Sequence, residues 1–280
     1  MIFWGLMRTA VLGILLAGAT ACVHAQWLNY PDARTPRARD GKPNLTAPAP
    51  RAPDGKPDLS GVWEPEPTPA SEIKRVLGEH FFDVQVDLVD GSKYTLNLFW
   101  DLKPDEAPVR PETAALIKQR AEISPPTVNC LPGGIPFAML VTPFKIVQAP
   151  REVVMLFEHP DPPRQIHTDG RPLPKDPEPS WLGSSTGTWQ GKTLVVETTG
   201  FNGKSWLDGF GHPLSESMHL TERYQRRDFG HMDVEMTFDD PKYYTRPFKV
   251  NLPMRLIADS SDILEDVCAE NEKDRAHLGH

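Results

Sequence analysis

The stretch GTWQGKTLVVE, residues 187–197, decides the fold class of this chain. It places two runs of strand-forming residues on either side of Gln190, Gly191 and Lys192. Glycine in a short connection between two such runs is a strong signal for a β-hairpin, because it adopts the backbone angles that tight turns require. We therefore predict that residues 187–190 and 193–198 form two paired antiparallel strands.

Similar runs flank this hairpin on both sides and extend the pattern over most of the chain. Short apolar or alternating runs between turn residues are typical of strands, and many such runs at even spacing indicate a barrel or a sandwich. The sequence therefore predicts a mainly β fold, a single antiparallel barrel or sandwich with one or two short helices. Predicted strands cover residues 82–89, 94–100, 144–148, 153–158, 187–190, 193–198, 218–227, 232–238, 248–256 and 263–268, and predicted helices cover residues 71–78 and 111–122.

Proline content and net charge narrow the class of protein further. The chain has 280 residues with 30 prolines, and its formal net charge is −8. Proline blocks helix interiors, which favours turns and strand edges. An acidic surface repels a phosphate backbone, so we expect no nucleic-acid partner. Residues 61–280, about 220 residues, suit a single β-rich domain.

The first 25 residues have the features of a cleavable signal peptide. Arg8 provides a short positive region, residues 10–19 are apolar or small, and Val23 and Ala25 suit a cleavage site. The apolar run is shorter than the ~20 residues that a membrane-spanning helix needs. We therefore expect a periplasmic or secreted protein whose mature chain has no transmembrane segment. Lipidation at Cys22 is the alternative, although the residues before it lack the leucine usual in lipoprotein signals.

Residues 26–60 form a proline-rich arm or linker that contains a short duplication. DGKPNLT at residues 40–46 is followed by DGKPDLS at residues 54–60. Asp-Gly and Lys-Pro pairs favour turns, so each copy is predicted to present one leucine to the domain from an extended arm. A disordered tether with a chance repeat explains the same pattern.

Cys130 and Cys268 are the two cysteines that remain after cleavage of the leader. In an oxidising compartment an isolated pair usually forms a disulfide, and we favour this pairing. A catalytic thiol is the alternative, but no basic residue adjoins Cys130 to lower the pKa of its thiol.

Two resemblances bear on the architecture. LSGVW at residues 59–63 is similar to the Gly-x-Trp element that opens the first strand of calycin, or lipocalin-like, barrels, and Gly187 and Trp189 repeat the theme. The resemblance implies a barrel with a tryptophan closing one end. Residues 143–271 also resemble an uncharacterised family of exported bacterial proteins, which implies one compact domain and no particular activity. The segments that carry this second resemblance are residues 168–172, 187–197, 200–202, 219–223, 239–241, 244–247 and 268–271.

The most concentrated polar region runs from residue 212 to residue 240. Alternation along a strand places His219, Thr221 and Arg223 on one face and Glu222 on the other. A hairpin through residues 228–230 could bring His219 and His231 together. Asp169 and Arg171 form a separate candidate at a predicted rim loop, where arginine could bind a carboxylate through two hydrogen bonds. Alternatively, Asp169 only caps its own turn.

Three interpretations of these residues stay open. One is a divalent metal site of His219 and His231 with Glu222, Asp233 or Glu216, although no dense ligand motif is present. A solvent-exposed sheet face with cross-strand ion pairs is the interpretation that we favour. The third is metal-free acid–base catalysis by His219, Glu222, Arg223, His231, Asp169 and Arg171. No cofactor is expected for the exposed sheet face or for this catalytic site.

Five aromatic residues follow one another in a short stretch and provide a candidate ligand site. Such residues line apolar pockets, although core packing is their more common fate. The predicted partner is a small, partly apolar molecule, handled either by a hydrolase, lyase or isomerase without a cofactor, or by a non-catalytic lipocalin-like binding protein. A metal-dependent enzyme is a further alternative. The five are Trp181, Trp189, Phe201, Trp206 and Phe210.

Overall fold

The computed structural model describes residues 31–77, 91–103, 105–259 and 262–268 of the chain. The predicted signal peptide, Cys22 and the predicted strand at residues 82–89 lie outside these residues and stay predictions. Among the described residues, no helix has the length and apolar character needed to cross a membrane.

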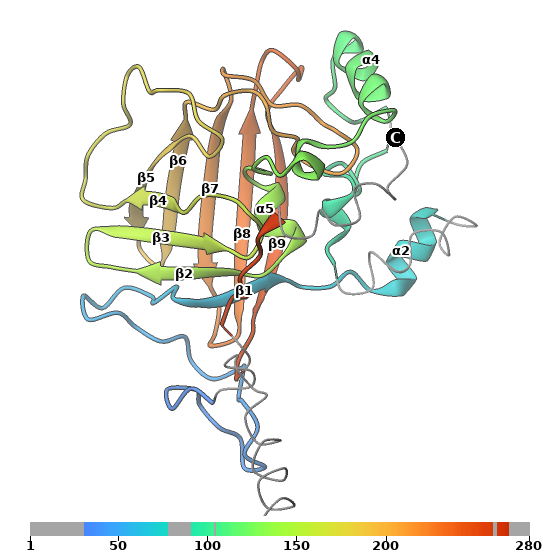
Figure 1. The fold of residues 1–280 in the computed structure, drawn as a ribbon. Coiled ribbons are helices and arrows are strands. Elements are labelled where there is room, and N and C mark those ends of the chain that lie inside the picture. The colour runs from blue at the N-terminus through green and yellow to red at the C-terminus, as the bar shows by residue number, and fades with distance from the viewer. Residues whose placement is uncertain (1–30, 78–90, 104, 260–261, 269–280) are drawn as a thin grey trace, which may run out of the picture.

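Nine strands close into one barrel, in which each strand is hydrogen-bonded to the next and β9 returns to β1 (Figure 1). The predicted mainly β fold is confirmed, and a barrel forms rather than a sandwich. The hairpin at Gly191 joins β5 to β6, with Gln190 opposite Thr193. The strands are β1 (Gly61–Pro65), β2 (Phe144–Gln148), β3 (Glu152–Phe157), β4 (Arg164–His167), β5 (Ser184–Gln190), β6 (Thr193–Thr199), β7 (His219–Arg226), β8 (His231–Asp239) and β9 (Phe248–Leu256).

One pair of neighbouring strands departs from the predicted antiparallel order. β4 and β5 run parallel, with Ile166 opposite Ser185 and His167 opposite Thr186. Parallel neighbours need a crossover connection rather than a tight turn, and the mostly irregular residues 168–183 supply it. β4 was not predicted, because three of the four residues in its sequence RQIH are polar and give little strand signal.

Side chains alternate between the interior of the barrel and its outer face. Along β8 the apolar residues from Met232 to Phe238 are buried, and the polar residues between them are partly exposed. This period of two follows from the pleat of a β-strand. Trp63 on β1 is fully buried in the same core, and its indole Nε1 donates to the Leu59 carbonyl oxygen at 2.9 Å.

Short helices account for the remaining regular structure of the described residues, and Met139 of one of them lies in the barrel core, 3.9 Å from the Tyr224 hydroxyl. The predicted helices at residues 71–78 and 111–122 correspond to α2 and α4, whereas α5 was not predicted. The helical segments are α2 (Ala70–Leu77), the 3₁₀ helix η3 (Lys93–Thr95), α4 (Pro111–Arg120), the 3₁₀ helix η4 (Pro126–Asn129) and α5 (Phe137–Val141).

Two predicted strands are wrong. Residues 94–100 form η3 and turns, because the side chains of Ser92 and Asn97 accept the backbone amides of Tyr94 and Phe99 at 3.3 and 2.8 Å. Such bonds offer the backbone an alternative to a sheet ladder. Residues 263–268 form no strand and run as an irregular tail.

The proline-rich arm contains two turns of the same geometry, one in each copy of the duplication. Asp40 accepts the backbone amide of Lys42 at 3.1 Å, and Asp54 accepts that of Lys56 at 3.1 Å. The arm contacts the barrel at both copies. Leu59 is buried, and the backbone carbonyl of Leu45 accepts the Gly230 amide in the β7–β8 turn at 2.7 Å.

Arg226 on β7 holds this arm to the end of the barrel. Its guanidinium lies 4.9 Å from the centre of the Trp63 ring. Burial lowers the pKa of Arg226 to about 10, so the side chain is still charged at neutral pH. Four backbone carbonyl groups accept its hydrogen bonds, those of Asp58, Ser60, Asp228 and Phe229.

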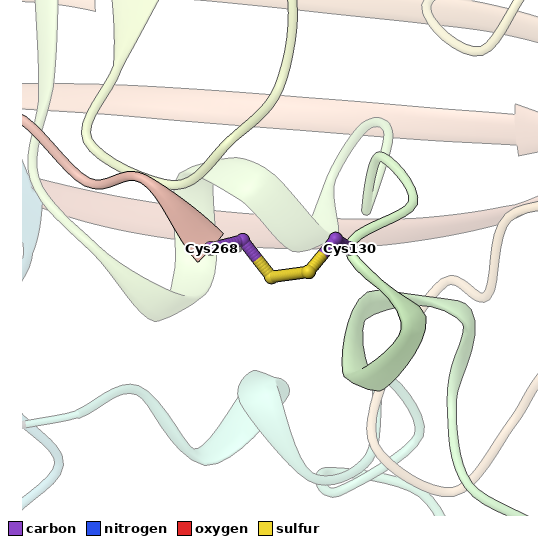
Figure 2. Close-up of a disulfide and its surroundings, with 2 residues drawn as sticks. All are labelled: Cys130 and Cys268. Atoms are coloured by element: carbon purple, nitrogen blue, oxygen red, sulfur yellow. A yellow bond between two sulfur atoms is a disulfide. The ribbon is translucent and has the colours of Figure 1, made fainter. Parts of the chain in front are cut away.

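The tail after β9 returns along the outside of the barrel and is bonded there by a disulfide at Cys268. Lys145 on β2 contacts Asp262, and Glu158 accepts the Leu264 amide at 2.6 Å. The predicted bond between Cys130 and Cys268 is present, with the two Cα atoms 5.6 Å apart (Figure 2). It ties the tail to the loop that precedes α5.

Removal of this disulfide should destabilise the protein. The bond joins cysteines 138 residues apart, and in the chain-entropy model such a link restricts the unfolded chain. We expect the double variant Cys130→Ser with Cys268→Ser to lose about 4–5 kcal/mol of unfolding free energy. Urea unfolding followed by tryptophan fluorescence measures the loss. The parent protein in reducing buffer is the control and should match the variant, whereas equal stability of the oxidised parent and the variant would contradict the prediction.

Candidate functional site

The predicted catalytic residues on β7 lie on opposite sides of the barrel wall. His219 and Arg223 are on the outer face, where His219 Nε2 lies 2.6 Å from Glu197 and Arg223 reaches Gln190 at 3.4 Å. Glu222 is completely buried inside the barrel. Neighbouring residues of a strand point to opposite faces, so the structure does not bring Glu222 together with His219 and Arg223.

His219 and His231 lie at opposite ends of the β7–β8 hairpin, so the expected meeting of the two residues is wrong. The register places His219 opposite Asp239, which is the other end of β8 from His231. At about 3.3 Å per residue, the two histidines are about 26 Å apart. His231 instead contacts Asp228 at 2.7 Å within its own turn. The pair cannot hold one metal ion.

Asp169 and Arg171 form a local ion pair at the rim, away from the residues on β7. Arg171 Nη2 lies 2.6 Å from the Asp169 carboxylate, and Arg151 approaches the same carboxylate at 3.4 Å. The hydrogen bond from Arg171 holds the pKa of Asp169 below its usual range. This geometry matches the alternative in which Asp169 caps its own turn.

The barrel interior contains a charged network centred on Glu222. Arg164 on β4 donates to both carboxylate oxygens of Glu222, with Nη1 at 2.9 Å from Oε1. The Tyr224 hydroxyl donates to Oε1 of the same carboxylate at 2.6 Å. Arg164 also donates to Thr198 at 3.0 Å and to Ser185 at 3.3 Å. These bonds satisfy the ion pair internally, which is the condition for burying two charges.

The protonation of this network follows from the contacts of its charged groups. Burial alone would lower the pKa of Arg164, but the adjacent Glu222 carboxylate outweighs burial and raises it. Burial, followed by the same carboxylate, raises the pKa of Tyr224 well above its ordinary value. Arg164 is therefore a cation and Tyr224 a neutral hydrogen-bond donor at neutral pH. Neither is poised to exchange a proton.

Two His–Asp pairs that the sequence did not single out serve as anchors for loops. His212 Nδ1 lies 2.6 Å from Asp208, and His159 Nδ1 lies 2.5 Å from Asp161. Both carboxylates also accept backbone amides, such as that of Leu98 by Asp208 at 2.8 Å. Their acceptor capacity is used within the fold, which assigns them a structural role.

The five predicted ligand-binding aromatic residues do not form one site. Phe201 and Trp206 are buried in the core, with Arg120 lying 5.2 Å from the centre of the Trp206 ring. Trp181 and Trp189 pack against the core from its edge. Phe210 is 49% exposed. Tryptophan and phenylalanine pack in cores more often than they line pockets, and the sequence carries no signal that separates the two.

The structure contains a cavity of about 940 Å³ outside the barrel, between the arm, the tail and the outer face of β1 and β2. Val62 and Lys145 lie opposite each other on these strands and face outward, because their neighbours Trp63 and Phe144 point into the core. The arm contributes residues 31–35 to the wall, and the tail contributes residues 257–259 and Asp262. This size lies within the range of small-molecule sites.

The floor of the cavity is apolar, and most charges at its edge are paired. Val62, Val147 and Leu256 are among the apolar lining residues. Arg34 is paired with Asp32 at 2.7 Å, Lys145 with Asp262, and Asp259 with Arg37. Arg226 donates to its four backbone carbonyl groups. Apart from Asp58, which hydrogen-bonds to the Ser60 amide at 2.9 Å, the edge therefore offers little uncompensated charge to a ligand.

Sequence reasoning missed this site for a definite reason. Its walls come from residues 31–35, 61–62, 145–147 and 256–259, which are far apart in the chain. The available signal was that Val62 and Val147 occupy strand positions whose side chains point outward. An apolar valine at such a position indicates an outer surface that another segment can cover. None of the aromatic or catalytic candidates lines the cavity within the part of the chain that the structure describes.

The Arg164–Glu222 pair provides a test of the structural interpretation of Glu222. In Glu222→Gln the shape is kept but Arg164 is left as a buried charge without its counter-ion, so the free energy of unfolding should fall by about 3–5 kcal/mol. Replacing both partners (Arg164→Met with Glu222→Leu) should restore part of this loss. Glu235→Gln breaks the exposed contact with Lys249 and is the control, with a loss below about 1 kcal/mol. Chemical denaturation measures all three, and equal losses for Glu222→Gln and Glu235→Gln would refute the assignment.

Among the described residues, no group of three or more His, Cys, Asp and Glu side chains is arranged to hold a metal ion. Comparisons of the chain with protein-family models, with curated proteins and with solved structures found no significant match. The resemblances to exported bacterial proteins and to calycins therefore stay predictions.

Proposed function

We propose that this chain is an exported protein that binds a small, partly apolar molecule in the cavity between the arm, the tail and β1–β2. The observation that carries the proposal is the cavity itself, about 940 Å³ in volume with an apolar floor. Soluble proteins rarely leave a large apolar surface in contact with water without a use for it. The predicted signal peptide accounts for the location.

The paired charges at the edge favour a ligand without net charge. A charged molecule would have to break an existing ion pair or lie unpaired near the floor, and an unpaired charge in apolar surroundings is costly. An uncharged molecule gains the burial of Val62, Val147 and Leu256 at no such cost. The proposed ligand is therefore a neutral, largely apolar molecule.

Binding without catalysis is favoured over the enzymatic alternatives. The six predicted catalytic residues occupy the outer face, the interior, a turn and the rim, so they share no substrate position. Acid–base catalysis needs its groups within hydrogen-bond reach of one reacting atom. The barrel interior is occupied by the network of Arg164 and Glu222, which leaves the outer cavity as the ligand site.

Titration with N-phenyl-1-naphthylamine, a neutral probe that fluoresces in apolar surroundings, tests the proposal. We expect saturable binding to the parent protein and weaker binding of the anionic analogue 8-anilinonaphthalene-1-sulfonate. Val147→Asp places a charge on the floor at a position that is already 41% exposed, so the fold should tolerate it. The affinity for the neutral probe should fall by about tenfold.

A matched variant separates this effect from a general loss of structure. Val128→Asp introduces the same charge in η4 at a position that is 60% exposed and outside the cavity lining. It should bind the probe as the parent does. Absence of saturable binding to the parent would overturn the proposed function, and equal loss in both variants would overturn the location.

A further inference from the structure

We infer that the ion pair between Arg37 and Asp259 is a latch that controls how fast a ligand leaves the cavity, an inference that rests on the proposed function. The latch joins the two walls of the cavity that come from opposite ends of the chain. Arg37 belongs to the arm, whose residues 31–35 line one side, and Asp259 lies on the tail and lines the other.

The contact has the geometry of a specific bridge between these walls. Both guanidinium amino groups of Arg37 contact the Asp259 carboxylate, with Nη2 at 2.7 Å from Oδ1. Planar bidentate pairing adds directional preference to the charge attraction. The two residues are 222 positions apart in the chain, so no local turn requires them to meet.

The backbone at Asp259 supports the same inference. Its φ angle is +57°, in the left-handed region that non-glycine residues rarely adopt. Backbone conformations of this kind persist where surrounding contacts determine them, and they cluster at ligand clamps and switches. Asp259 lies in a turn, where aspartate adopts this region more readily than most residues, and its bidentate contact with Arg37 is one of the surrounding contacts.

Other attachments limit what the tail can do when the latch opens. The Ile257 amide donates to the Val62 carbonyl oxygen at 2.9 Å, next to the end of β9. Beyond Asp259 the tail is held by the contact of Lys145 with Asp262, by the Leu264 amide that Glu158 accepts and by the disulfide at Cys268. Among the described residues of the arm, Arg37 contacts this part of the tail through its side chain, at Asp259. Parting of Arg37 from Asp259 therefore separates the two walls without unfolding the barrel.

The accessibility of the pair makes the latch sensitive to ionic strength. The side chains of Arg37 and Asp259 are 33% and 19% exposed. Salt screens charges that water reaches, so added salt should weaken this contact. The apolar floor responds to salt in a different way, since excluded salts strengthen apolar burial.

The test is the rate at which N-phenyl-1-naphthylamine dissociates from the full protein, measured by stopped-flow fluorescence. Arg37→Gln and Asp259→Asn each remove one charge, and asparagine tolerates the left-handed backbone. Each variant should release the probe about threefold to fivefold faster than the parent. The double variant should be no faster than either single one, because both changes remove the same contact.

Controls and salt dependence complete the experiment. Lys249→Gln breaks an exposed ion pair on β9, away from the cavity, and should leave the dissociation rate unchanged. Sodium chloride should speed release from the parent more than from Arg37→Gln, in which the exposed Lys145–Asp262 pair is still present. Unchanged rates in both single variants, or additive effects in the double one, would overturn the latch while leaving the binding site in place. Failure of the parent to bind the probe would overturn both the latch and the proposed function.

Discussion

The ion pair between Arg164 and Glu222 is the constraint on which the interior of the barrel depends. Two charges away from water are stable only when all their donors and acceptors are matched, and Tyr224, Thr198 and Ser185 provide those matches. The pair links β4 to β7, which are not neighbours in the sheet. Since β4 meets β5 at only two register positions, this cross-barrel contact helps to fix the place of β4. It also fills the space in which a barrel could otherwise hold a ligand.

Much of the barrel was predictable because its strands obey simple alternation. β2 and β9 lie where the sequence predicted them, since each has apolar residues at every second position and turn residues beyond. β4 was missed for the opposite reason: one of its two inward residues is Arg164, and a charge that points inward looks like a surface residue in the sequence. Residues 94–100 were wrongly predicted as a strand, because their apolar side chains are buried from turns rather than from a sheet.

The candidate site was much less predictable than the fold. Alternation along the strand places His219 and Glu222 on opposite faces. The sequence alone therefore indicated that these two side chains do not share a site. The distance between His219 and His231 depends on the hairpin register, which follows from the whole sheet and not from either strand. The cavity is a still longer-range feature, because its walls meet through contacts such as Arg37 with Asp259. No local pattern encodes a meeting of that kind.

The closure of the barrel between β1 and β9 has a consequence for the order of events during synthesis. A ribosome makes residues 61–65 long before residues 248–256, so β1 must wait for its second partner until almost the whole chain has emerged. The arm, which leaves the ribosome before β1, meets its partners Arg226 and Asp259 near the end. The cavity is therefore among the last features to form, because a chain truncated before β9 would contain most of the lining residues but not Leu256 or the wall that the tail contributes.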